Sequence, residues 1–198
     1  MGDNDQYFSW SPDGKWILAG WSNGTASLWE VATQQRKHVW TGQHLPILRL
    51  SFSADGQTAL TGATWRFPAS QLWDVATGKQ KGIVHEIEPT PSWPLFSNDG
   101  QKLLILDKDQ SMRIYSTSNG KSLSSVAGKV VPYQDVLFTE EGKEVVGIDC
   151  TRIASHDTST GAQMDAVAFQ CAGNHDHVSL GPDAQSLLVT HGSHVMEW

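Results

Sequence analysis

Side chains that could bind a metal gather near the C-terminus of the chain. Two short segments, CAGNHDHV at 171–178 and THGSH at 190–194, contain six of them: Cys171, His175, Asp176, His177, His191 and His194. Imidazole and thiolate groups are common ligands of zinc and similar ions. The spacing matches no standard structural zinc motif, and solvated loop histidines account for the same letters. We therefore predict no metal site and keep a metal-binding enzyme or sensor as the alternative.

Signatures of common catalytic and phosphate-binding sites do not occur in the sequence. It contains no G-x-S-x-G elbow, no H-E-x-x-H helix and no G-x-x-x-x-G-K-[ST] loop. The segment NGKS at 119–122 has the ending of a phosphate loop, but Tyr115 stands where the first glycine belongs. We also expect this segment in a turn between strands, whereas a phosphate loop precedes a helix. We predict no catalytic residue, no cofactor and no enzymatic activity.

Two landmarks recur along the chain at a nearly constant interval. The turn segments WSPDG, FSADG, FSNDG, FTEEG and LGPDA end at Gly14, Gly56, Gly100, Gly142 and Ala184, at steps of 42, 44, 42 and 42 residues. The second landmark is Trp29, Trp73, Tyr115, His156 and Trp198, at steps of 44, 42, 41 and 42 residues. A period shared by two landmarks indicates internal repeats.

Each repeat is expected to form four short strands. Asp-Gly between apolar runs favours a tight turn, because glycine adopts positive φ and aspartate accepts hydrogen bonds from the local backbone. The third unit shows the pattern, with WPLF, KLLIL, MRIYS and SLSSV separated by polar turns. The second strands, such as KLLIL and EVVGI, are largely apolar, which is typical of strands covered on both faces.

With SPDG at 11–14 and LWDV at 72–75, the chain resembles the WD-repeat β-propeller family over residues 6–198. Four strands per unit of about 42 residues agree with this resemblance. It implies an all-β propeller of four-stranded antiparallel blades, four of them complete and the fifth three-stranded. We expect one domain, 1–198, that is divided into five units: 6–42, 43–86, 87–128, 129–171 and 172–198.

The fifth unit ends at its third expected strand, so the ring is expected to be incomplete. Three explanations remain: a piece of a longer protein, a five-bladed ring with an imperfect seal, or an open arc sealed by another chain. We favour the first. An open blade edge could also pair with another copy, because an uncovered strand edge is a template for pairing.

Charge and hydropathy exclude other classes of protein. The 14 basic and 21 acidic residues give a net charge of −7, which argues against a nucleic-acid surface. No apolar run approaches the length of a membrane helix, and the N-terminal segment lacks the pattern of a secretory signal. Two cysteines make no disulfide framework, so we expect a cytoplasmic protein.

The nine tryptophans fall into two groups. Trp10 occupies the position of Phe52, Phe96, Phe138 and Leu180 in the other units, so we predict a buried wedge there. Trp29, Trp73 and Trp198 share the third-strand position and are expected to be structural. Other tryptophans lie outside the repeat pattern, and two of them, Trp65 and Trp93, lie in enlarged connections.

These two connections supply our candidate partner-binding patch. Trp65, Arg66 and Phe67 belong to WRFP, and Trp93 ends EPTPSW. Both connections should emerge on one face of neighbouring blades, and tryptophan and arginine are enriched at interface hot spots. We add three rim candidates: His44, Lys129 and Tyr133. The resemblance implies a non-catalytic platform for protein partners; a regulatory module of a missing catalytic domain is a further alternative.

Overall fold

The computed structural model describes strands throughout and connects them by tight turns. The residues that it describes are 6–41, 45–63, 69–85, 94–106, 111–126, 135–139, 142–148, 152–168, 177–180, 186–191 and 194–197. Within these ranges every regular element is a strand. No helix with the length and apolarity needed to cross a membrane occurs there.

In the described part of the chain, nineteen strands form five separate sheets. The first blade consists of β1 (Gln6–Trp10), β2 (Trp16–Trp21), β3 (Ala26–Glu30) and β4 (Gln35–Trp40). The second consists of β5 (Ile47–Phe52), β6 (Thr58–Ala63), β7 (Ala69–Asp74) and β8 (Gln80–His85). The third consists of β9 (Leu95–Phe96), β10 (Lys102–Leu106), β11 (Met112–Ser116) and β12 (Ser122–Val126). The fourth consists of β13 (Asp135–Phe138), β14 (Glu144–Ile148), β15 (Arg152–Asp157) and β16 (Gln163–Ala168). The fifth consists of β17 (His177–Leu180), β18 (Leu187–His191) and β19 (His194–Glu197).

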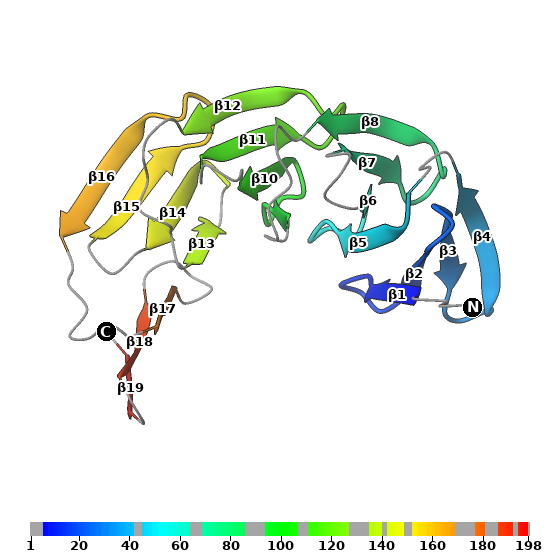
Figure 1. The fold of residues 1–198 in the computed structure, drawn as a ribbon, viewed down its shortest axis with the longest axis horizontal. Coiled ribbons are helices and arrows are strands. Elements are labelled where there is room, and N and C mark those ends of the chain that lie inside the picture. The colour runs from blue at the N-terminus through cyan, green and yellow to red at the C-terminus, as the bar shows by residue number, and fades with distance from the viewer. Residues whose placement is uncertain are drawn as a thin grey trace.

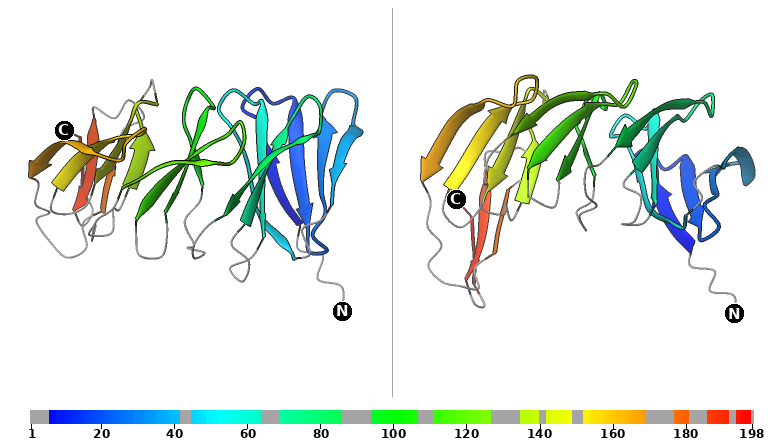
Figure 2. Two further views of the ribbon diagram at one scale, coloured as in Figure 1. Left: turned by 90° about the horizontal axis from the view of Figure 1, so that it is seen from above. Right: turned by 45° about the horizontal axis from the view of Figure 1, so that its top comes forward.

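The predicted fold class is confirmed. Each sheet is antiparallel, its strands follow chain order, and the first four sheets have four strands each while the last described sheet has three. The blades stand side by side along an open arc, with the first strand of each full blade toward the concave side and the fourth toward the convex side (Figure 1). The first and the last blade lie at opposite ends of this arc (Figures 1 and 2).

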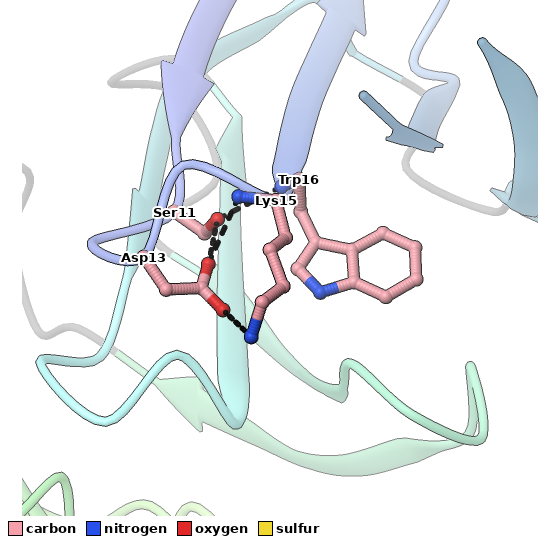
Figure 3. Close-up of polar contacts among 4 residues, drawn as sticks. All are labelled: Ser11, Asp13, Lys15 and Trp16. Carbon is pink, nitrogen blue, oxygen red and sulfur yellow. Dashed lines mark hydrogen bonds and ion pairs between the residues drawn. The ribbon is translucent and has the colours of Figure 1, made fainter. Parts of the chain in front are cut away.

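The repeated turn between the first and second strands is held by a serine and an aspartate. In the first blade the Ser11 hydroxyl donates to Asp13 Oδ1 at 2.7 Å, and the Trp16 amide donates to Ser11 Oγ at 2.9 Å (Figure 3). The hydrogen bond from Ser11, followed by those from Lys15, lowers the pKa of Asp13 to about 2. Ser53 with Asp55 and Ser97 with Asp99 make the same bond. The repeated SxDG letters therefore encode one local turn.

The first and second blades join through a stacked pair of tryptophans. The rings of Trp40 and Trp73 lie 4.9 Å apart between centroids at 13°. Trp40 Nε1 donates to the carbonyl of Gly78 at 2.9 Å, and Trp73 Nε1 donates to Thr61 Oγ1 at 2.8 Å. Both indole N–H groups are thus satisfied while the rings fill the junction, which is the arrangement that buried tryptophan favours.

The later junctions combine apolar packing with a few polar contacts. One cluster joins the second and third blades through Leu60, Leu72 and Val84 on one side and Phe96, Leu103, Ile105 and Tyr115 on the other. Between the third and fourth blades, Lys102 Nζ donates to the Gly142 carbonyl at 2.8 Å and to Thr158 Oγ1 at 2.6 Å. These contacts hold each blade to the one before it.

A glycine in the turn between the third and fourth strands lets the second, third and fourth blades approach their predecessors. Gly120 has φ +71°, and a Cβ placed on it would lie 2.6 Å from the carbonyl oxygen of Ile83 in the second blade. The first blade has Gln34 at this position, also left-handed at φ +56°. A residue with a Cβ is strained in this conformation, and at Gly120 it would also meet backbone.

Matched substitutions at these two turns should have opposite effects on stability. We expect Gly120→Ala to destabilise the protein by more than about 1 to 2 kcal/mol, because the methyl group adds both backbone strain and a steric clash. We expect Gln34→Gly to change stability by no more than about 1 kcal/mol, toward higher stability, because strain is removed and nothing is packed against it. Urea unfolding monitored by circular dichroism measures both; equal losses in the two variants would contradict the junction geometry.

Candidate interaction surface on the first blade

One face of each inner blade packs against the blade that precedes it. In the second blade the first junction buries Leu50, Phe52, Ala59, Trp73 and Val75. They meet the first blade's Leu18, Ala26, Leu28 and Trp40. In the third blade Phe96, Leu103 and Tyr115 occupy the positions of Phe52, Ala59 and Trp73 and are buried in the same way. The same set of repeat positions therefore makes each contact with the preceding blade.

In the first blade these positions form an apolar surface against which, among the described residues, no preceding blade packs. Strand register places them on one face, because directly opposed residues in antiparallel strands share a face: Phe8 lies opposite Ala19, Trp10 opposite Ile17, and Ile17 opposite Trp29. We call this surface the open face and define it by Phe8, Trp10, Ile17, Ala19, Trp21, Trp29 and Val31. It lies at the β1 to β4 end of the arc (Figure 1).

The prediction of a buried wedge at Trp10 is wrong. Trp10 is 59% exposed and Phe8 is 60% exposed, whereas Phe52 and Phe96 at the position of Trp10 are 7% and 9% exposed. The strand and its side-chain direction agree with the repeat, but burial at this position comes from the preceding blade. Among the described residues, no blade precedes β1. The exposure of Trp10 is thus a consequence of its place at the end of the arc.

The open face contains a groove of about 660 Å³. Its lining is Phe8, Ile17, Ala19, Trp21, Trp29, Glu30, Val31 and Gln34. Three of these side chains are aromatic, and the polar residues Glu30 and Gln34 belong to the end of β3 and to the turn that follows it. An exposed apolar patch of this kind, with polar groups at its rim, marks an interaction surface in soluble proteins.

The indole of Trp29 differs from its counterpart in the second blade. Trp73 donates its N–H to Thr61, but the first blade has Ala19 at the position of Thr61. Trp29 consequently has no hydrogen-bond acceptor among the described residues. On its ring face, the guanidinium carbon of Arg36 lies 6.0 Å from the ring centroid. Trp29 therefore offers a partner both an apolar ring and a hydrogen-bond donor.

The acidic rim of the groove is already paired. Glu30 accepts a hydrogen bond from the hydroxyl of Thr33, and Lys37 Nζ lies 3.0 Å from Glu30 Oε2. The bond from Thr33, followed by that from Lys37, lowers the pKa of Glu30. Glu30 is therefore ionised near neutral pH, with its charge balanced by Lys37. This arrangement favours an apolar occupant of the groove.

The partner-binding patch predicted from the sequence lies outside the described residues. This holds for all seven candidates: His44, Trp65, Arg66, Phe67, Trp93, Lys129 and Tyr133. The strand ends that flank these segments are described. In the second blade, the start of β5 pairs with the end of β6 through Ile47 and Ala63, and the start of β7 pairs with the end of β8 through Ala69 and His85.

The potential metal ligands of the fifth unit are only partly described. His177 begins β17 opposite Thr190, and His191 lies opposite His194 at the turn between β18 and β19. The other three, Cys171, His175 and Asp176, lie outside the described residues. Within the described ranges, no group of three or more histidine, cysteine, aspartate or glutamate side chains could hold an ion. The structure therefore adds no support to the metal alternative.

The analysis of the repeats did not predict the places of two tryptophans. Trp21 lines the groove, and Trp40 stacks on Trp73. A signal for Trp40 was present in the sequence, because an apolar residue recurs at or next to the end of the fourth strand as Trp40, Val84 and Val126, all of which are buried. Trp21 ends β2 on the open face and has no comparable pattern.

The open face predicts a contrast between two substitutions at one repeat position. We expect Trp10→Ala to cost less than about 1 kcal/mol, because the side chain is mostly exposed. Phe52→Ala should cost about 3 to 5 kcal/mol, because it removes a packed ring from the first junction. Chemical unfolding of both variants measures these costs, and a large loss for Trp10→Ala would show that Trp10 is buried after all.

Comparison of the sequence with known proteins agrees with the repeated four-stranded blades. The family model described as "WD domain, G-beta repeat" matches residues 7–30, which span β1 to β3. The protein tipD of Dictyostelium discoideum is 24% identical over 86% of this chain. The WD repeat-containing protein 26 homolog of Arabidopsis thaliana is 24% identical over 74%, and the DENN domain and WD repeat-containing protein SCD1 of the same plant is 25% identical over 67%.

This chain covers only a part of those relatives. The aligned regions amount to 28% of tipD, 25% of the WD repeat-containing protein 26 homolog and 11% of SCD1. Most of the length of each of these relatives therefore lies outside the aligned region. The matched repeat, the WD-repeat relatives and the four-stranded antiparallel blades together make the chain similar to WD-repeat proteins.

Proposed function

We propose that this protein is a non-catalytic platform for protein–protein interaction, built from WD repeats as a single domain and belonging to a longer protein or assembly. The observation that carries the proposal is the open face of the first blade. It exposes the ring of Trp10 and more than half of Phe8, and it contains the aromatic groove. Repeats of this family generally serve as interaction scaffolds, and the relatives share those repeats.

The chemistry of the open face supports a protein occupant. Equivalent side chains in the second and third blades pack against another sheet, so the surface has the shape and polarity of a sheet-to-sheet contact. Aromatic residues are enriched at the centres of protein interfaces, where they exclude water over a large area. Beside the groove, Lys37 balances the charge of Glu30, while the guanidinium of Arg36 lies over the ring of Trp29.

A second docking surface is proposed on the connections that contain Trp65, Arg66, Phe67 and Trp93. Its rim candidates are His44, Lys129 and Tyr133. Support comes from the flanking strands: β6 and β8 both end, and β5 and β7 both begin, at one end of the second blade. Segments that leave from these strand ends start close together. A cytoplasmic location stays a prediction. Metal binding by the fifth unit stays the alternative, which metal analysis of purified protein would test.

Capture of protein partners tests the proposed function. The wild-type chain, Trp10→Ala and the double variant Trp65→Ala/Trp93→Ala would each be immobilised at equal density and exposed to cell extract. If a captured protein contacts one of the two surfaces, the variant altered at that surface should retain about tenfold less of it than the wild-type chain. Loss of an aromatic hot-spot residue at other interfaces has an effect of this size. The double variant is expected to show this loss for partners of the second surface. Captured proteins that are retained equally by all three chains would contradict both surfaces.

A further inference from the structure

The open face has an arginine at a position where the other four-stranded blades have an uncharged side chain. Arg36 on β4 lies directly opposite Trp29 on β3, so the two side chains share the open face. The residues at this position in the second, third and fourth blades are Gln80, Ser122 and Gln163. Among the four-stranded blades, only the first therefore has a charge at this position.

The guanidinium of Arg36 lies over a ring and has no anionic partner among the described residues. Its central carbon is 6.0 Å from the centroid of the Trp29 ring, and the side chain is exposed. The ion pairs of the described residues are Lys15 with Asp13 and Lys37 with Glu30. A guanidinium on an aromatic face keeps the N–H groups at its edge available, and its planar fork matches the two oxygens of a carboxylate.

The charges beside the groove favour an acidic group in the occupant. Lys37 balances Glu30, which leaves the charge of Arg36 unbalanced at the rim of the groove, although the whole chain has a net charge of −7. At physiological ionic strength, exposed charges more than about 8 Å apart are largely screened. A carboxylate beside Trp29 is therefore attracted by Arg36 more strongly than it is repelled by distant acidic groups.

The groove itself selects an apolar side chain close to that acidic group. Phe8, Trp21 and Trp29 line its volume of about 660 Å³, and the Trp29 N–H can donate to a backbone carbonyl of the occupant. Neighbouring strands lie about 4.8 Å apart, and an extended chain advances about 3.3 Å per residue. A residue in the groove over β2 and β3 and a residue at Arg36 on β4 are therefore about two or three positions apart.

We propose that the open face binds an acidic apolar peptide segment of a partner protein. Such a segment is extended and has an aromatic or branched aliphatic residue about two or three positions from an aspartate or glutamate. The apolar side chain fills the groove, the carboxylate pairs with Arg36, and a backbone carbonyl accepts the N–H of Trp29. This inference rests on the proposed function, because it names the chemistry of the partner of the same open face.

Selection from a phage library of random dodecapeptides tests this chemistry. The wild-type 198-residue chain, Arg36→Glu and Lys79→Glu are immobilised, and peptides are selected on each separately. Lys79→Glu is the matched control, because Lys79 is also an exposed cation but lies in the turn between β7 and β8 of the second blade. Selected peptides are synthesised with a fluorescent label and titrated by fluorescence polarisation. Circular dichroism and thermal melts establish folding of each chain.

We expect the wild-type chain and Lys79→Glu to enrich acidic apolar peptides. These peptides should bind Arg36→Glu about tenfold more weakly or less, because attraction between opposite charges becomes repulsion between like charges. Arg36→Glu should itself enrich peptides with lysine or arginine in place of the acidic residue. Trp29→Phe keeps a ring but removes the donor, and should weaken binding about two- to tenfold. Reversal of the selected charge separates recognition by Arg36 from general loss of folding.

Three results would overturn the inference. They are a wild-type chain that enriches no peptide, enriched peptides that lack an acidic residue, and acidic peptides that bind Arg36→Glu as tightly as the wild type. If one of these results is found but Trp10→Ala still loses captured protein, the inference fails and the proposed function stands. If Trp10→Ala in addition captures protein as well as the wild type does, the open-face proposal fails too.

Discussion

Packing of one apolar sheet face against the next holds this protein together. A single apolar sheet leaves the side chains of both its faces in contact with water. Here each inner blade buries both faces against the neighbouring blades. Leu18, Leu60 and Leu104 in the middle strands meet rings such as Phe52 and Phe96 in the first strands of the following blades. The tight turns around Asp13 and its counterparts set the strand register that places those side chains in contact.

The uncovered apolar face at the end of the arc follows from the same requirement that each sheet pack against its neighbours. A repeated sheet that packs on both sides leaves one apolar face uncovered wherever the described array stops, and terminal repeats usually become polar for this reason. The first blade instead keeps Phe8, Trp10 and Trp29 and adds Trp21. At the turn after its third strand it has Gln34, where the second, third and fourth blades have glycine. The open face is therefore apolar like an internal junction but differs from one at its rim.

Periodicity predicted the sheets because strand pairing and turn chemistry are local. The repeated tight turns and the short apolar runs between them were enough to locate four four-stranded blades and a three-stranded fifth. Burial could not be predicted the same way, since Trp10 and Phe52 share a repeat position and differ only in what lies beside them. Trp40 was missed because its role depends on a ring in another blade. The patch around Trp65 and Trp93 stays a prediction, because those connections follow no repeat and lie outside the described residues.

Solvent accessibility of individual tryptophans tests the central claim most directly: the face that every inner blade buries is open on the first blade. Hydroxyl-radical footprinting of the dilute chain, read by mass spectrometry, compares residues of identical chemistry. The account predicts that Trp10 is oxidised much faster than Trp40 and Trp73, which are 4% and 7% exposed. Protection of Trp10 equal to that of Trp40, at a concentration where the chain is monomeric, would contradict it.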